Sequence, residues 1–299
     1  MEVIRQDPTA PEPFQTLATL YEEQGELERS LQFGLLAAHL APQDGEEWAR
    51  LADMSLEQGE ENQAADCYKK AIDAAPGVAS YHFTRARLLE QIGDRRGSIR
   101  CYRRLLGELG EGQGEQFIQA TKLLAKLLHQ KEDLEEAVKC FSTAFEKFPD
   151  NVDNDDVNLY LELLTSLGWY NQALGVCCEM CEVKFGGSSL PQEELSDLDS
   201  DQQLATFEEL VVPPDLPADI RAKLIVILVH LDALHLIQDL CQQFLEADIE
   251  DFGDLVIDIV EAMMKMEKWE SALPLLLLAS TSDKLVSWPN YSFLQFPVL

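Results

Sequence analysis

Positive charge is scarce in this sequence. Its 299 residues contain 23 lysines and arginines against 54 aspartates and glutamates, which gives a formal net charge of 23 − 54 = −31. The field of such a chain repels a polyanion, so its general surface is not suited to binding DNA or RNA. Basic protein partners are compatible with this charge.

Long hydrophobic runs and a paired cysteine framework are also missing. The longest apolar runs, Leu224–Val229 and Leu273–Ala279, are too short to span a bilayer. The first residues contain no apolar segment typical of a secretion signal. Seven cysteines, an odd number, are spread along the chain, which argues against a disulfide-stapled secreted module and favours a reducing compartment. We therefore expect a soluble intracellular protein that makes no membrane contact.

A repeat of constant length organises the first part of the chain. Pro8, Pro42 and Pro76 are evenly spaced, and each follows an apolar segment with helical periodicity. Because proline cannot continue a helix, this recurrence predicts helical units that end at a fixed spacing. Gly25 and Gly59 recur at the same interval as the prolines, and they supply the permissive backbone that a tight turn inside each unit requires.

The interval and the positions within it match the tetratricopeptide (TPR) pattern, in which two paired helices form one unit of about 34 residues. Small residues such as Ala52 and Ala64 let the helices approach closely, while Trp48 and Tyr68 fill the space between them. One pair cannot cover its own apolar face, so neighbouring pairs must stack. Five units can be followed up to Phe185. We therefore expect an all-α fold, a right-handed TPR superhelix (α-solenoid).

Composition divides the chain into four parts. Residues 1–185 form the TPR array of about five units, and residues 186–218 form an acidic linker without lysine or arginine that we expect to be disordered. Further TPR-like helical repeats occupy residues 219–284, with Asp219 as the expected N-cap. Residues 285–299 form an apolar tail that does not continue the repeat. We expect this chain to be a truncated form of a longer array, and a docking peptide is the other interpretation of its tail.

No group of residues in the sequence matches a catalytic or metal-binding pattern. Cys178 and Cys181 have CxxC spacing, but no second pair of zinc ligands lies nearby, so we interpret them as small apolar residues on an inner helix face. The glycine-rich segment 107–114 lacks the Lys-Ser/Thr pair of a phosphate loop, which indicates an inter-repeat loop. We expect no enzyme activity, no cofactor, no metal and no small-molecule substrate.

The concave groove of the array is the first candidate binding surface. In a TPR superhelix the first helix of each pair faces inward, and in the first two units its inward positions are mostly acidic. An acidic groove favours a basic or mixed peptide, whose affinity falls as salt rises. The groove positions are Glu12, Gln15, Thr19, Glu22, Glu46, Ala49, Asp53 and Glu57.

A basic patch in the third unit is the second candidate surface. Several of its arginines share one face of the expected second helix. They form either a dock for an acidic segment or phosphate, or a solvated face that glutamates of adjacent repeats neutralise, which is the interpretation that we favour. The patch consists of Arg95, Arg96, Arg100, Arg103 and Arg104.

Several segments resemble one family beyond the repeat pattern itself. Residues 17–42, 46–59, 93–106, 223–234 and 251–262 are similar to the TPR subunit of the RNA polymerase III transcription factor TFIIIC. The likeness covers nearly the whole chain ahead of the apolar tail. It implies a nuclear, non-enzymatic scaffold that helps recruit TFIIIB to promoters. The implied partners are other TFIIIC subunits and TFIIIB subunits, and DNA is contacted only indirectly through the complex.

The alternative hypothesis is a generic TPR adaptor or co-chaperone that binds peptide segments of another complex. Chaperone-type TPR domains hold a C-terminal carboxylate with lysine and asparagine side chains in the groove. The groove positions of this sequence lack that set, which counts against the alternative.

Overall fold

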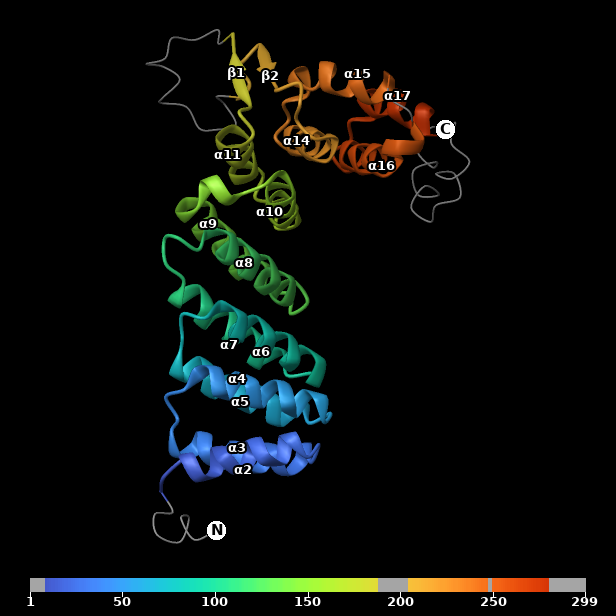
Figure 1. Ribbon diagram of the computed structural model, residues 1–299. Coiled ribbons are helices and arrows are strands. Elements are labelled where there is room, and N and C mark those ends of the chain that lie inside the picture. Colours follow the sequence, from blue (N-terminus) through green and yellow to red (C-terminus); the bar gives the residue numbers. More distant parts are fainter. Residues whose placement is uncertain (1–8, 188–203, 247–248, 280–299) are drawn as a thin grey trace. The chain divides into compact units, whose positions relative to one another are not determined.

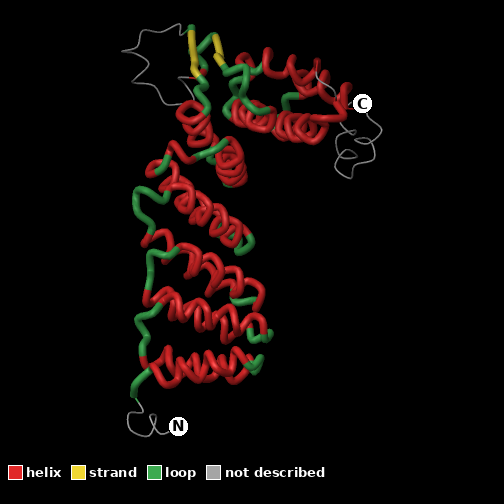
Figure 2. Tube along the Cα trace, viewed as in Figure 1, coloured by secondary structure: helices red, strands yellow, loops and turns green. Residues whose placement is uncertain are grey.

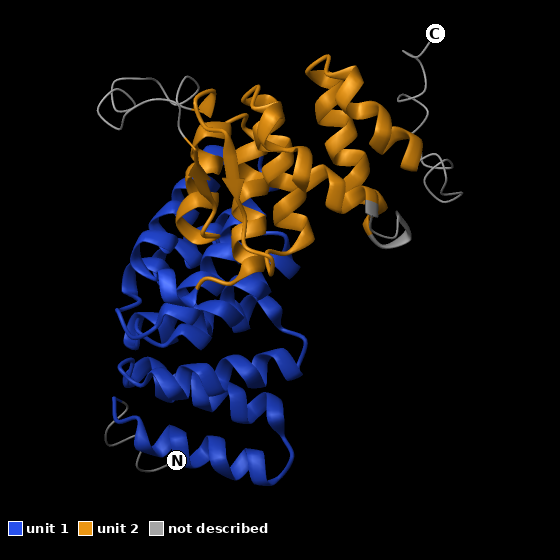
Figure 3. Ribbon diagram, turned by 90° about the horizontal axis from the view of Figure 1, so that it is seen from above, with its two compact units in different colours: residues 1–151 blue, residues 152–299 orange. Residues whose placement is uncertain are grey.

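The computed structural model describes residues 9–187, 204–246 and 249–279 (Figure 1). Helices make up almost all of the regular structure in these residues (Figure 2), and the expected all-α TPR class is confirmed. The chain divides into two compact units, residues 1–151 and residues 152–299 (Figure 3).

Unit 1 consists of helix pairs that stack in sequence order (Figure 1). Within each pair the two helices pack against each other, and the second helix of one pair packs against the first helix of the next. This is the stacking that the repeat pattern predicts. The pairs are α2 (Glu12–Glu23) with α3 (Leu27–Leu40), α4 (Gly45–Glu57) with α5 (Glu61–Ala74), α6 (Ala79–Ile92) with α7 (Arg95–Glu108), and α8 (Gly114–His129) with α9 (Leu134–Lys147), followed by the short 3-10 helix η1 (Pro149–Asn151).

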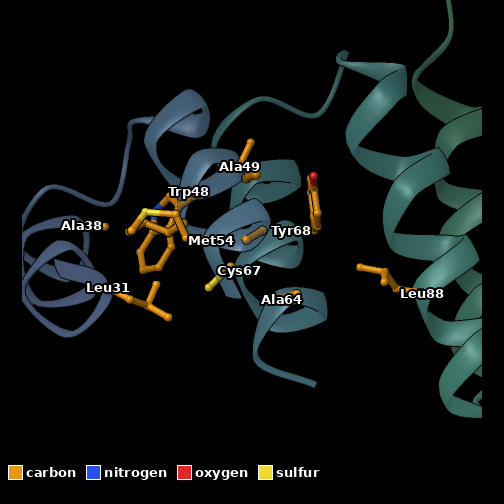
Figure 4. Close-up of a cluster of buried hydrophobic side chains, with 12 residues drawn as sticks. Leu31, Ala38, Trp48, Ala49, Met54, Ala64, Cys67, Tyr68 and Leu88 are labelled. Carbon is orange, nitrogen blue, oxygen red and sulfur yellow. The ribbon is translucent and has the colours of Figure 1, made fainter. Parts of the chain in front are cut away.

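The apolar core of unit 1 runs between the helices of each pair and between neighbouring pairs. Trp48 is 1% exposed and Tyr68 is 5% exposed, while Ala64 is fully buried. These side chains pack in one cluster with Leu31 of the preceding pair and Leu88 of the following pair (Figure 4). Burying a large apolar side chain contributes about 1.5–3 kcal/mol, so the cluster joins three successive pairs into one stable stack.

A residue with left-handed backbone lies within three residues of the end of the first helix of each pair. Gly25, Gly59 and Gly93 have φ angles of 77°, 79° and 91°, as the glycine spacing predicts. Glu132 takes the equivalent place between α8 and α9 with a φ of 63°. A side chain in this conformation costs about 1–2 kcal/mol, which glycine avoids.

Unit 2 contains further helix pairs and a small two-stranded ribbon. The same left-handed conformation marks the turn inside each of these pairs, at Gly168, Asp232 and Glu267. The elements are α10 (Asn154–Ser166), α11 (Tyr170–Met180), β1 (Lys184–Gly186), β2 (Glu209–Val211), α14 (Ala218–His230), the 3-10 helix η2 (Leu234–Leu236), α15 (Gln238–Glu246), α16 (Ile249–Lys265) and α17 (Trp269–Ala279).

The disorder expected across residues 186–218 is wrong at both ends of that segment. Strands β1 and β2 pair antiparallel, with Phe185 opposite Leu210. Phe185 also stacks on Phe207, with 5.2 Å between the ring centroids. The apolar contact and the strand hydrogen bonds together hold residues 184–186 against residues 207–211. Residues 188–203, between the two strands, lie outside the described residues.

The expected N-cap at Asp219 is also wrong. Helix α14 begins at Ala218 with Pro217 before it, so Asp219 lies in the first turn and not at the cap. There its carboxylate faces the positive end of the helix dipole, which is favourable without a capping hydrogen bond. The 3-10 helix η2 separates α14 from α15. The apolar tail, residues 285–299, lies outside the described residues.

Candidate functional site

The predicted groove positions of the first two units lie on α2 and α4, the first helices of their pairs. Seven of the eight are exposed. Ala49 is the exception, because it is only 8% exposed and belongs to the apolar core cluster. Its small side chain packs at a helix contact, so Ala49 is removed from the groove lining.

Arg50 partly neutralises the acidic groove. Its guanidinium lies 2.9 Å from Glu47 on the same helix and 3.3 Å from Glu22 on α2, so it links the first two pairs. These carboxylates raise the pKa of Arg50, and the largest cause is the hydrogen bond that Arg50 donates to Glu47. Glu22 therefore has a partner within the array and is less available to a ligand.

Asp53 is engaged as well. The Tyr68 hydroxyl on α5 donates a hydrogen bond to Asp53 Oδ1 on α4. Burial, followed by this hydrogen bond, raises the pKa of Tyr68, so the phenol stays protonated and keeps its donor role. Glu46 and Glu57, by contrast, are exposed and have no side-chain hydrogen bond or ion pair to a described residue.

The basic patch lies on α7, and all five of its arginines are exposed. Arg103 forms an ion pair with Glu136 on α9, and Arg104 forms one with Asp73 on α5 at 2.6 Å. These pairs connect the third unit to both of its neighbours, as the solvated-face interpretation expects. The other three arginines of the patch form no ion pair with a described residue.

Unit 2 contains a polar pocket that was not predicted from the sequence. It has a volume of about 500 Å³ and is lined by the first helices of three pairs, α10, α14 and α16, together with the start of α11. The inner side of a TPR array is built from first helices, so this pocket lies on the first-helix side of unit 2. Its size falls in the range of ligand-binding clefts.

Lys223 of α14 ties two walls of the pocket together. Its Nζ donates to the backbone carbonyl of Asn158 at 2.9 Å and lies 3.4 Å from Glu162 Oε2, both on α10. Burial lowers the pKa of Lys223, and the nearby carboxylates oppose that shift. The ammonium is thus held in place by protein oxygens.

A stacked pair of rings forms another part of the lining. Tyr170 and His230 lie with their centroids 4.1 Å apart and their planes 18° from parallel. His230 Nδ1 is 2.9 Å from the carbonyl oxygen of Val226. Since a carbonyl can only accept, Nδ1 carries the hydrogen in this bond, which fixes the orientation of the ring.

Asp258 of α16 is the carboxylate most affected by its surroundings in the pocket. Partial desolvation raises the pKa of Asp258, and repulsion from Glu261 adds to the effect, while the opposite charge of Lys223 lowers it. A carboxylate in this situation is stabilised by any additional positive charge that comes within contact distance.

The repeat register would have identified one wall of this pocket. Gly25 and Gly168 occupy equivalent turns in the first and fifth pairs. Aligning the chain on these two turns carries three exposed groove positions of α2 onto Asn158, Glu162 and Thr165, and all three line the pocket. The walls that α14 and α16 form could not be predicted in this way, because the β1–β2 ribbon interrupts the repeat spacing after α11.

The CxxC pair and the glycine-rich segment of the sequence have structural roles. Cys178 and Cys181 are free thiols, and burial raises the pKa of Cys181 to about 11, so it is protonated and unreactive at neutral pH. Residues 109–113 join α7 to α8, so an inter-repeat loop is present, but it is shorter than the expected segment 107–114, whose two ends belong to the helices. In the described parts of the chain, no three histidine, cysteine, aspartate or glutamate side chains are grouped to hold a metal, and no helix is long and apolar enough to cross a membrane.

Comparison with solved structures finds chains with low overall similarity. The crystal structure of MamA protein covers 57% of this chain and 90% of its own, at 12% identity and a TM-score of 0.38. The crystal structure of YrrB, described as a TPR protein with an unusual peptide-binding site, covers 60% and 88%, at 19% identity and a TM-score of 0.36. Scores this low carry no argument about the present chain.

Comparison at the level of sequence is more informative. A tetratricopeptide repeat model matches residues 48–77 and 123–151. Human General transcription factor 3C polypeptide 3 is 40% identical over 285 residues, which are 95% of this chain and 32% of that protein. The present chain therefore spans about a third of the length of this relative. Together with the stacked helix pairs, these matches identify the chain as an all-α TPR protein related to a subunit of human general transcription factor 3C.

Proposed function

We propose that this chain is a non-enzymatic scaffold of the RNA polymerase III initiation machinery, acting as a TFIIIC subunit that helps recruit TFIIIB to promoters. The observation that supports it is the 40% identity to a general transcription factor 3C subunit across 95% of the chain. In this proposal the partners are other TFIIIC subunits and TFIIIB subunits. DNA is reached only through the complex, and the site of action is the nucleus.

The physical properties of the chain fit a protein-binding role. Stacked pairs build an extended surface whose two faces are made of different helices, which suits a scaffold that holds elongated segments. A net charge of −31 favours basic or mixed partners over nucleic acid. Glu46 and Glu57 present free carboxylates on the first-helix side of unit 1, where a partner segment would bind.

Co-purification from nuclear extract tests the proposal. The full chain would serve as bait, with an unrelated acidic TPR protein of similar charge as the control, and bound proteins would be identified by mass spectrometry. We expect TFIIIC and TFIIIB subunits to be enriched over the control. Enrichment of heat-shock proteins in their place would contradict the proposal and favour the adaptor or co-chaperone hypothesis.

A further inference from the structure

The pocket of unit 2 has an excess of negative charge that its own lysines do not cancel. Lys223 contacts Glu162 on α10. Lys265 contacts Glu261, one turn before it on α16, at 2.9 Å. Asp219 and Asp258 form no ion pair with a described residue. With two ammonium groups and four carboxylates in the lining, the formal charge is 2 − 4 = −2. A cation that enters therefore meets two carboxylates without a partner.

The groups beside these carboxylates favour a guanidinium over an ammonium. The Tyr170 and His230 rings stack face to face in the lining, and a guanidinium can stack on an aromatic face. A guanidinium also offers five N–H donors in one plane, whereas an ammonium offers three and is more strongly hydrated. Asn158, also in the lining, has a buried Oδ1 that accepts no hydrogen bond from a described residue.

We propose that this pocket is a receptor for an arginine side chain that a partner protein presents on an extended segment. The guanidinium packs against the Tyr170–His230 stack and donates hydrogen bonds to the carboxylates of Asp258 and Asp219. The lysines of the lining stay paired with their glutamates and do not compete with it. The inference rests on the proposed function in one respect only, which is that the arginine belongs to a protein partner.

A titration with short peptides tests the pocket directly. The probe is an acetylated and amidated pentapeptide, Gly-Ser-Arg-Ser-Gly, and its matched control carries citrulline, which has the shape of arginine without the charge. Amide chemical shifts of the full isotope-labelled chain report both the affinity and the location of binding. We expect the arginine peptide to shift amides of α10, α14 and α16, and the citrulline peptide to bind at least about fivefold more weakly.

Two variants of the chain separate the pocket from the general acidic surface. Asp258→Asn removes one unpaired carboxylate at constant size, and we expect it to weaken binding of the arginine peptide by about fivefold. Glu270→Gln changes the net charge by the same amount at an exposed position of α17 and should leave the affinity unchanged. A third variant, Tyr170→Leu, keeps all charges but removes the stacking surface, and we expect it to reduce the preference for arginine over a lysine peptide.

The outcomes are distinct. Equal affinity for the arginine and citrulline peptides, shifts confined to other helices, or tighter binding of a matching glutamate peptide would each overturn the inference. The peptide comparison uses the unaltered chain, so a variant that fails to fold does not affect it. If the chain captures TFIIIB and TFIIIC subunits but does not bind the arginine peptide, only the inference about the pocket is rejected. Arginine binding without capture of those subunits would reject only the proposed function.

Discussion

His82 is a fully buried histidine in the third helix pair. Its Nε2 lies 3.0 Å from the carbonyl oxygen of Pro76, so this nitrogen donates, and Nδ1 faces the thiol of Cys101 at 3.9 Å. Burial lowers the pKa of His82 below its ordinary value of 6.5. The ring is therefore neutral in the folded state at neutral pH, and its protonation opposes folding.

We predict that His82 makes unit 1 less stable in mild acid. The unfolded chain binds a proton at this ring as the pH falls below 6.5, whereas the folded chain binds it only at a lower pH, so stability is lost as the pH falls through that range. Thermal melts at about pH 7.5 and 5.5 would compare the parent with His82→Gln. Relief of repulsion between carboxylates affects both proteins equally. On acidification the melting temperature of the parent should fall more, or rise less, than that of the variant. Equal changes in the two proteins would contradict the prediction.

Packing positions were easier to predict from the sequence than polar contacts. Trp48 and Tyr68 were assigned to the core from repeat positions, and both are buried. The burial of Ala49 and the hydrogen bond between Tyr68 and Asp53 were not predicted. Both depend on how closely helices approach in three dimensions, which the pattern of one helix does not contain.

Ala64 gives a test of the predicted register. It is fully buried between helices, so Ala64→Trp would overpack that contact and should cost about 1–3 kcal/mol of unfolding free energy. Lys69→Trp, at an exposed position of the same helix, should change stability by no more than about 0.5 kcal/mol. Denaturant unfolding monitored by circular dichroism measures both. An unfolding curve of Ala64→Trp equal to that of the parent would show that the register is wrong.

At the level of elements, one backbone conformation defines every helix pair. The left-handed turn residue is glycine in the first three pairs, which made those pairs visible in the sequence. Glu132, Asp232 and Glu267 adopt the same conformation without being glycine, so the turns that they form were not marked. The ribbon was not predicted, because Phe185 and Leu210 pair across a long stretch of sequence and local composition does not show such a pairing.

We predict that Glu132→Gly stabilises the fourth helix pair. Glycine removes the cost of a side chain at positive φ, and after the loss of unfolded-chain entropy a net gain of about 0.5–1 kcal/mol is expected. Glu135→Gly, inside α9, should destabilise by about 1 kcal/mol, because the backbone there is helical. Unfolding free energies from urea titration measure both changes. A loss of stability in both variants would contradict the role assigned to the Glu132 turn.

At the level of the whole molecule, the distribution of charge determines which surfaces are available. The fold class and the face that carries the groove could be predicted, because repeat spacing fixes which helix of each pair lies on that side. It could not be predicted which groove carboxylates are free, because this depends on contacts between helices. Arg50 pairs with Glu22, and Tyr68 donates a hydrogen bond to Asp53. A test of the groove should therefore change Glu46 and Glu57, at the two ends of α4.

The most direct test compares two double variants in binding to a purified TFIIIB subunit, measured by fluorescence anisotropy at several salt concentrations. Glu46→Lys with Glu57→Lys reverses charge on the first helix of the second pair. Glu28→Lys with Glu61→Lys makes the same charge change on the second helices, at exposed positions. We predict that the groove variant weakens binding by roughly tenfold at low salt, while the control variant stays within about twofold of the parent. Equal affinities of the two variants would contradict a groove that binds partner proteins.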